Sequence, residues 1–150
     1  MKKISFLLLI PLLVMSCMHV DTTGDEVDIK KPEKDGILIH VTAGYDDTHR
    51  VLMPFKMATL MADTKDVILY LDIHAGELVV KDAEDVVMDG FDPLSTYIES
   101  LLDKGVEIYA CPTCLNVMGY TPDDLIKGIK TAEKEAFFDF TEGRIVTMDY

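Results

Sequence analysis

From residue 36 onward, short apolar runs alternate with longer segments that mix apolar and polar positions. The runs at 37–41, 67–71 and 106–110 are almost continuously apolar, which is typical of parallel strands covered on both faces. The segments 129–132 and 144–148 predict two shorter strands. Because these strands alternate with helix-like segments, the sequence predicts an α/β fold with a mostly parallel sheet of about five strands.

The first predicted helix follows the strand at 37–41 and a turn at Gly44. Asp47 or Thr48 is placed to cap a helix that runs to about Ala62. Pro54 lies inside this segment, and a proline removes a backbone hydrogen bond unless it sits in the first turn. We therefore expect the helix to begin near Met53.

The second predicted helix begins at Asp92, which is placed as its cap, with Pro93 at its first position. Its apolar residues recur at helical spacing, and Gly105 ends it. A short helix is predicted to start at Thr121, and residues 134–141 also have a helix-like pattern.

The N-terminus has the layout of a secretory signal. Lys2 and Lys3 precede an apolar run at 4–15, which as a helix would span about 18 Å, too short for a bilayer core of about 30 Å. The run ends in Val14-Met15-Ser16-Cys17, which resembles a bacterial lipobox. We expect residues 1–16 to be a lipoprotein signal peptide and Cys17 to be lipidated, which makes the protein extracytoplasmic and membrane-anchored, in the periplasm or at the cell surface. The alternative is an ordinary signal peptide with an incidental cysteine.

Residues 17–35 are polar and charged, and they predict a flexible tether before one domain at 36–150. The chain has 14 Lys and Arg against 27 Asp and Glu, a formal net charge of −13. This acidity argues against binding nucleic acid or anionic lipid through charge.

The most informative motif is Cys111-Pro112-Thr113-Cys114, at the end of the strand at 106–110. A thiol just before a helix lies near its positive end, which lowers the thiol pKa and raises the thiolate fraction. Pro112 has no N–H, so donors to sulfur are expected from Thr113, Cys114 or Leu115. Such a pair can exchange disulfides, bind metal or carry sulfur, and a half-buried pair without a role is the alternative.

Other polar residues follow the strand ends, where ligands bind in parallel sheets. His74 follows the strand at 67–71 and is a candidate base or thiolate partner, and Asp72 lies beside it. His49 begins the first helix near the same edge, whereas His40 lies inside a strand and is predicted to be a core residue.

No metal or cofactor is expected. A zinc site needs ligands beyond the one cysteine pair, and the acidic stretch 82–92 lacks EF-hand spacing. That stretch is expected to be a solvated loop placed to cover the cysteine pocket. Met53, Met57 and Met61 recur at helical spacing and are predicted to lie in the core or an oligomer interface.

Three stretches carry a resemblance to a known family: Gly36-Ile37-Leu38-Ile39-His40-Val41-Thr42, Asp66-Val67-Ile68-Leu69-Tyr70-Leu71 with Gly76-Glu77-Leu78-Val79, and Val106-Glu107-Ile108-Tyr109-Ala110-Cys111-Pro112-Thr113-Cys114. On these, residues 36–150 resemble the DsrE/DsrF-like family, which includes TusD-type sulfur-relay subunits and YchN-like proteins. In relay members the active cysteine ends the third strand eight residues before a glycine, a spacing that Cys111 and Gly119 share. Cys114 matches the second cysteine of YchN-like members.

The resemblance implies a three-layer sandwich, a homotrimer or homohexamer, and a cysteine, Cys111, that carries persulfide sulfur between donor and acceptor proteins. Met118 stands where relay members usually carry arginine before the glycine, so a cation that would help hold a sulfur anion is missing. Relay members work in the cytoplasm as hetero-oligomers, whereas in an oxidising compartment Cys111 and Cys114 can close a disulfide.

The sequence leaves three hypotheses open. The first is a membrane-tethered sulfur carrier that uses Cys111, with Cys114 and His74 as further site residues. The second is a dithiol–disulfide redox protein that uses the cysteine pair. The third is a non-catalytic oligomeric lipoprotein scaffold, so the sequence does not decide whether the protein is an enzyme.

Overall fold

The computed structural model describes residues 33–150. Residues 1–32, with the predicted signal peptide, Cys17 and most of the predicted tether, lie outside the described residues. The described elements are β1 (Gly36–Val41), α1 (Thr48–Met61), β2 (Asp66–Leu71), the 3-10 helix η1 (Ala75–Val79), α2 (Leu94–Asp103), β3 (Glu107–Ala110), α3 (Pro112–Met118), the 3-10 helix η2 (Pro122–Asp124), β4 (Lys130–Thr131), α4 (Ala136–Asp139) and β5 (Ile145–Asp149). Within residues 33–150, no helix is long and apolar enough to cross a membrane.

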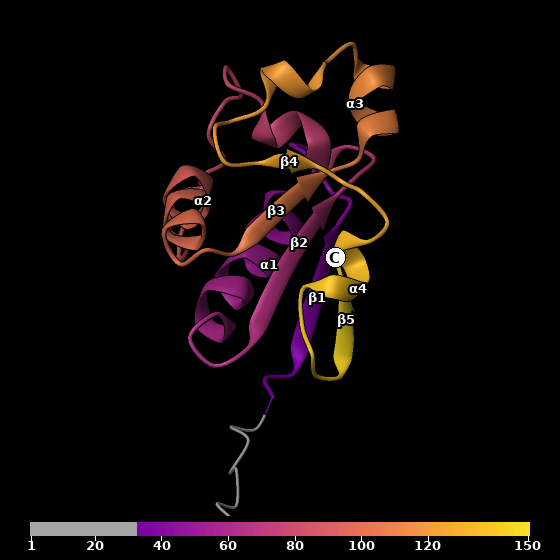
Figure 1. The fold of residues 1–150 in the computed structure, drawn as a ribbon. Coiled ribbons are helices and arrows are strands. Elements are labelled where there is room, and N and C mark those ends of the chain that lie inside the picture. Colours follow the sequence, from indigo (N-terminus) through magenta and orange to yellow (C-terminus); the bar gives the residue numbers. More distant parts are fainter. Residues whose placement is uncertain (1–32) are drawn as a thin grey trace, which may run out of the picture. The chain divides into compact units, whose positions relative to one another are not determined.

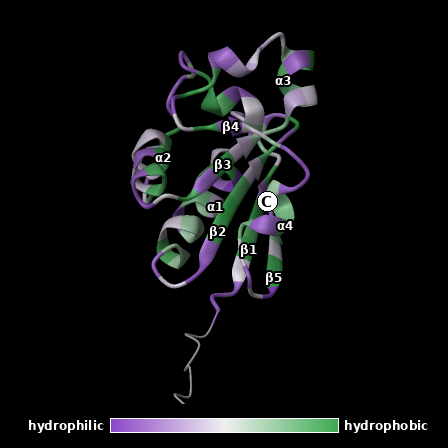
Figure 2. Cartoon of the chain, in the orientation of Figure 1, coloured by the Kyte–Doolittle hydropathy of each residue, from purple (hydrophilic) through white to green (hydrophobic). Residues whose placement is uncertain are grey.

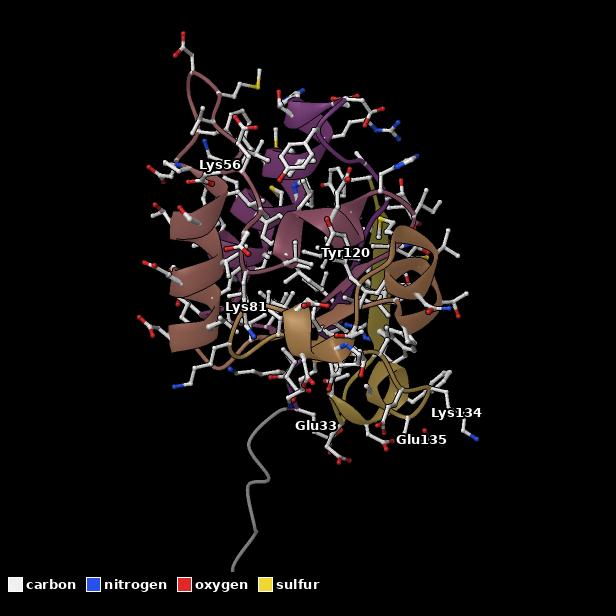
Figure 3. The ribbon with its side chains drawn as sticks, turned by 90° about the horizontal axis from the view of Figure 1, so that it is seen from above. Glu33, Lys56, Lys81, Tyr120, Lys134 and Glu135 are labelled. Atoms are coloured by element: carbon white, nitrogen blue, oxygen red, sulfur yellow. The ribbon has the colours of Figure 1, made fainter. Side chains whose placement is uncertain are left out.

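The strands form one five-stranded sheet in the order β4-β3-β2-β1-β5, and every neighbouring pair is parallel (Figure 1). The helices α1 and α2 cover one face, and α4 lies against the other (Figure 1). Figure 3, which looks down from above, shows Lys56 of α1 and Lys134 beside α4 on opposite sides of the molecule. The predicted three-layer α/β sandwich is confirmed, although α4 spans only four residues.

The hydrophobic core lies between the sheet and the layer of α1 and α2. Ile39 of β1, Leu69 of β2 and Phe55 of α1 have no exposed surface. Burying side chains of this size stabilises a fold by about 1.5–3 kcal/mol each. Figure 2 shows the same pattern, with hydrophobic central strands and hydrophilic connections. This core fixes the strands, and through them the positions of the residues that follow each strand.

The first helix begins earlier than its sequence predicts. Asp47 is its N-cap and accepts a hydrogen bond from the N–H of Arg50 at 3.1 Å, and α1 then runs through Pro54 rather than starting near Met53. Val51 lies in this first part of α1 and is fully buried. Burial of this turn outweighs the hydrogen bond that Pro54 removes.

The cap of the second helix also differs from the prediction. Pro93, not Asp92, is the N-cap of α2, and Pro93 has no side chain that can accept a hydrogen bond. Asp85 supplies the acceptor instead: its carboxylate accepts from the N–H of Ser95 at 3.0 Å and from the Ser95 hydroxyl at 2.6 Å. A residue of the acidic 82–92 loop therefore holds the start of α2, a contact across ten positions that helix-start patterns do not include.

The carboxyl ends of β1, β2 and β3 meet at one edge of the sheet, where η1 and α3 pack against each other (Figure 1). Gly76 of η1 lies against Met118 and Leu115 of α3 in this contact. The contact places the start of α3 directly above the ends of the strands.

Candidate functional site

Cys111 joins the end of β3 to the start of α3. Its N–H donates to the carbonyl of Leu71 at 2.8 Å, which ties it to the end of the neighbouring strand β2. It is the N-cap of α3, and its Sγ accepts the N–H of Cys114 at 3.3 Å. Pro112 takes the first position of the helix, where a missing N–H costs nothing. The motif thus directs the free backbone donors of the helix start at a half-buried sulfur.

Cys114 lies one turn further along α3 and is held from the opposite side. Its Sγ accepts the backbone N–H of Ile73, the second residue after β2, at 3.3 Å. Ile73 has φ +50°, in the left-handed region that a β-branched residue seldom adopts, and its side chain is 54% exposed. Strain of this kind persists where the surroundings enforce it, and here it aims an N–H at a thiol.

The two thiols have pKa values shifted in opposite directions. Burial raises the pKa of Cys111, but hydrogen bonds from the thiol and the N–H of Cys114, with those from Tyr70 and Thr113, leave it below its usual value. The pKa of Cys114 is raised, first by its hydrogen bond to Cys111 and then by burial. Cys111 is therefore the better nucleophile, and Cys114 keeps its proton at a higher pH.

Of the donors expected from sequence, Thr113 and Cys114 do act on the sulfur of Cys111. The N–H of Leu115 instead donates to the carbonyl of Cys111 at 3.0 Å, as in a regular helix. Within residues 33–150, both cysteines of the motif are free thiols and both are partly buried.

Tyr70 is a site residue that sequence reasoning missed. Burial first, and then its hydrogen bond to Cys111, raise the pKa of Tyr70, so its hydroxyl remains a donor to the sulfur at neutral pH. Its ring stacks on His40 with centroids 5.3 Å apart and meets Phe137 of α4 edge-on at 5.0 Å. The available signal was one aromatic residue with a polar tip in the otherwise aliphatic run 67–71.

His40 is not the core residue that its place inside β1 predicts. It points to the face of the sheet opposite α1, where its side chain is 26% exposed. Its Nδ1 forms a hydrogen bond with Oδ1 of Asp149 at 3.0 Å. Its Nε2 lies 2.9 Å from Oδ1 of Asp72, close enough for an ion pair but without the alignment of a hydrogen bond. Alternation along β1 sends His40 away from the core, because Ile39 and Val41 fill that side.

The structure brings Cys111 and Cys114 together but leaves His74 apart from their hydrogen bonds. His74 precedes η1, its N–H donates to the carbonyl of Thr42 at 3.2 Å, and its ring is exposed. Among residues 33–150, the His74 ring has no hydrogen-bond or ion-pair partner. His49 of α1 instead meets the ring of Phe91 edge-on at 5.5 Å.

The two largest hollows described lie away from the cysteines. One, of about 530 Å³, opens on the α4 face beside Glu107, Tyr109 and Lys130. The other, of about 310 Å³, is lined in part by the acidic loop, where Glu84 accepts the hydroxyl of Tyr45 at 2.8 Å. In the part of the chain from residue 33 on, no group of three or more His, Cys, Asp or Glu side chains is placed to hold a metal ion.

Solved structures share this fold. The ychN protein from E. coli matches with a TM-score of 0.59 and 17% identity, over 77% of this chain and 99% of that protein. A protein of unknown function from Methanobacterium thermoautotrophicum, MTH1491, matches with a TM-score of 0.53 and 19% identity, over 77% and 99% of the two chains. At these identities the likeness shows the fold.

No curated protein sequence matches the chain. A model of the DsrE/DsrF/DrsH-like family matches residues 29–148, which include every strand of the sheet and both cysteines of the motif. A match over this length establishes the family that the resemblance predicted. The chain belongs to the DsrE/DsrF/DrsH-like family.

Proposed function

We propose that this protein is a membrane-tethered sulfur carrier that forms a persulfide on Cys111. Membership of the DsrE/DsrF/DrsH-like family supports a function of the sulfur-relay type in general. The observation that carries the specific proposal is the set of hydrogen bonds to Cys111, from the N–H and thiol of Cys114, from Tyr70 and from Thr113. They stabilise a sulfur anion at this position, which both the attacking thiolate and the product persulfide require.

The chemistry is a pair of sulfur exchanges. The Cys111 thiolate attacks the outer sulfur of a donor persulfide, so that a new S–S bond forms at Cys111, the donor S–S bond breaks, and the donor leaves as a thiolate. An acceptor thiolate then attacks the outer sulfur on Cys111, takes it as its own persulfide and restores the Cys111 thiolate. Neither step changes the total number of electrons, so no external oxidant is needed.

Hydrogen bonds replace a cation at this site. Met118 stands just before Gly119 and brings no positive charge to the sulfur, while neutral donors surround Cys111 on the side of β2 and at the start of α3. This arrangement stabilises a thiolate without holding it in an ion pair, which keeps it available to attack.

Mass spectrometry of the intact protein tests the proposal. The reduced full-length Cys17→Ser protein is mixed with inorganic polysulfide, and Cys114→Ser is added to prevent loss of the sulfur by internal disulfide formation. We expect a gain of one sulfur atom in Cys114→Ser that is lost when Cys111→Ser is added. A fully reduced protein that gains no sulfur at Cys111 contradicts the carrier function.

A dithiol–disulfide redox function is the second candidate, and the opposite pKa shifts of the two thiols favour it. A low-pKa Cys111 attacks and is attacked first, and Cys114 completes the disulfide. In that case the pair titrates reversibly between about −120 and −270 mV, the range of known exchange proteins. A pair that never closes the bond excludes this candidate.

Anchoring through lipid on Cys17 and self-assembly belong to the same proposal. Phe138, Ile145 and Val146 expose apolar side chains around α4 and β5, which is consistent with an assembly surface there. Light scattering of the full-length protein tests for a homotrimer or homohexamer. Radiolabelled fatty acid that enters the wild type but not Cys17→Ser tests lipidation. If replacing both motif cysteines leaves the cellular role unchanged, the protein is a scaffold.

A further inference from the structure

A carboxylate and an imidazole adjoin the residues that hold the cysteine pair: Asp72 precedes Ile73, and His40 stacks on Tyr70. Neither is used by the sulfur exchanges described above. Asp72 follows β2 directly, its N–H donates to the carbonyl of Val41 at 3.1 Å, and its buried Oδ1 lies 2.9 Å from Nε2 of His40. The next residue, Ile73, donates its N–H to Sγ of Cys114. Asp72 is thus fixed by β1 on one side and joined by a single peptide unit to the donor that holds Cys114.

Cys114 needs a proton acceptor at the moment it attacks. Its hydrogen bond to Cys111 and its burial raise its pKa, and the negative charge of Asp72 raises it further. At neutral pH Cys114 is therefore a thiol, whereas only a thiolate displaces sulfur from a disulfide or persulfide. The nearby Asp72 carboxylate disfavours the free thiolate but is itself a base to which the proton can pass.

We propose that the Asp72 carboxylate takes up the proton that Cys114 releases when Cys114 attacks the sulfur bonded to Cys111, and that His40 is the positioning residue for this carboxylate. The inference deepens the proposed function and rests on it for the identity of the sulfur carried on Cys111. It gives the Cys114 side of the motif a role in unloading the carrier.

The step balances as follows. Cys114 attacks Sγ of Cys111, a Cys111–Cys114 disulfide forms, and the bond from Cys111 to the outer sulfur breaks. The outer sulfur, which carries a proton in the –SSH form that reacts, leaves as hydrosulfide (HS⁻) with the electron pair of the broken bond, while the thiol proton of Cys114 passes to Asp72. The persulfide is the oxidant, since its outer sulfur is reduced as the two cysteines become a disulfide.

His40 lies between Asp72 and an exposed carboxylate. His40 faces Asp72 with Nε2 and Asp149 with Nδ1, and the Asp149 side chain is 69% exposed. Tyr70 from β2 stacks on His40, and Cys111, the N-cap of α3, accepts from Tyr70. Phe137 from α4 closes this side with an apolar ring. The titratable groups around Asp72 and His40 are therefore Asp149, Tyr70 and Cys111.

An aromatic disulfide reagent that releases a coloured thiolate isolates the attack by Cys114. The assay uses the full-length Cys17→Ser protein, in which Cys111 and Cys114 are the remaining thiols that can react with the reagent. Cys111 reacts first and releases one coloured thiolate; Cys114 then attacks the mixed disulfide and releases the second. The rate of this second phase is measured from pH 6 to pH 10 in the Cys17→Ser parent and in three variants of it: Asp72→Asn, His40→Gln and Asp89→Asn. Asp89 is an exposed acid and serves as the control.

We expect Asp72→Asn to slow the second phase by about 100-fold at neutral pH, the lower end of what a positioned proton acceptor contributes. The rate should recover towards that of the parent at high pH, where hydroxide removes the proton. His40→Gln should slow the same phase less, with the same recovery, and Asp89→Asn should leave it unchanged. A change that only damaged the fold would lower the rate equally at every pH.

The opposite result is equally clear. If Asp72 acted only through its charge, its removal would lower the pKa of Cys114 and speed the second phase. A faster or unchanged second phase in Asp72→Asn overturns the inference, as does a slow phase that high pH does not restore. The assay uses no persulfide: if polysulfide adds no sulfur to Cys111 while the expected kinetics hold, the carrier function fails and the proton-acceptor role stands.

Discussion

The two faces of the sheet differ in what covers them. Under α1 and α2, Ile39, Leu69 and Phe55 have no exposed surface, and these three carry no polar group. On the opposite face, α4 spans four residues, and β1, β2 and β3 present His40, Tyr70 and Tyr109 there. One face is filled with aliphatic and aromatic side chains, and the other carries hydrogen bonds and charge pairs.

The apolar face contributes the hydrophobic core, and the polar face contributes the residues around the cysteines. The apolar face holds the strands in register, and that register fixes where each strand ends. The polar face then brings Tyr70 and Asp72 to the cysteines, with His40 beside them. The polar face also buries Ile68 and most of Tyr109, so the comparison concerns which face carries the chemistry.

The largest expected effect is on the free energy of unfolding, when a phenylalanine is removed from each face in turn. Phe55→Ala, in the core, should lower the free energy of unfolding by about 3–5 kcal/mol. Phe138→Ala, on α4, removes the same group from a site that is 70% exposed and should change it by no more than about 0.5 kcal/mol. Urea unfolding measures both, and equal costs would show that the α4 layer is as important to stability as the core.

A second prediction concerns the polar face and the reactivity of Cys111. Tyr70→Phe removes a hydroxyl that donates to Cys111, so the pKa of Cys111 rises and its thiolate fraction at neutral pH falls. One hydrogen bond is worth about 1 kcal/mol, so alkylation of Cys111 should slow about fivefold at neutral pH. Cys17→Ser combined with Cys114→Ser is used as the background, so that Cys111 is the single thiol that reports.

Tyr109→Phe is the matched control for that experiment. Tyr109 pairs with Tyr70 in the register of β2 and β3, but its hydroxyl donates to Glu107 at 3.0 Å. Its loss should leave the reactivity of Cys111 unchanged. Equal slowing in both variants would mean that the tyrosines act by packing rather than by a hydrogen bond to sulfur.

A third prediction compares two residues with positive φ at the site edge. Gly119 ends α3 with φ +86°, and a Cβ there would meet nothing within 4 Å, so Gly119→Ala should cost about 1 kcal/mol from the backbone alone. Ile73 already carries that kind of strain at φ +50°, so Ile73→Gly should not lower the free energy of unfolding. A loss as large as that of Gly119→Ala would show that the Ile73 side chain packs for stability.

The fold was predictable because strands covered on both faces leave continuous apolar runs in the sequence. The runs at 37–41, 67–71 and 106–110 gave β1, β2 and β3 to within one residue. The start of α1 was wrong because a local rule about Pro54 competed with burial of its first turn. The cap of α2 was wrong because Asp85, seven residues before Asp92, reaches the helix across a loop.

The cysteines were recognisable from their spacing, but their neighbours were not. His40, Asp72 and Asp149 come from three separate segments and meet only because β1 lies between β2 and β5 with a fixed register. Strand alternation alone places His40 on one of two faces, and an unknown register leaves its partners open. His74, favoured by its position after a strand, has an exposed ring because the chain turns into η1 there.

The smallest expected effect on stability comes from the ion pair of Arg144 and Asp35, which lies just before β1 and β5 begin. The guanidinium donates from Nε and from one terminal nitrogen to the two carboxylate oxygens of Asp35, each at 2.9 Å. These hydrogen bonds hold the pKa of Asp35 at about 2, below the ordinary value of 3.8. The pair joins the residue before β1 to the residue before the edge strand β5.

The sign of the pH dependence follows from the lowered pKa. A carboxyl whose pKa is lower in the folded state stabilises the fold above its unfolded value, and this stabilisation is lost as pH falls from about 4 to about 2. The difference in unfolding free energy between wild type and Arg144→Gln should therefore be largest near neutral pH, shrink over that window and shrink with added salt. The loss caused by Phe55→Ala should depend on neither. A cost of Arg144→Gln that persists at pH 2 would mean that Arg144 acts through its aliphatic stem, and that β5 is held by packing as the other face is.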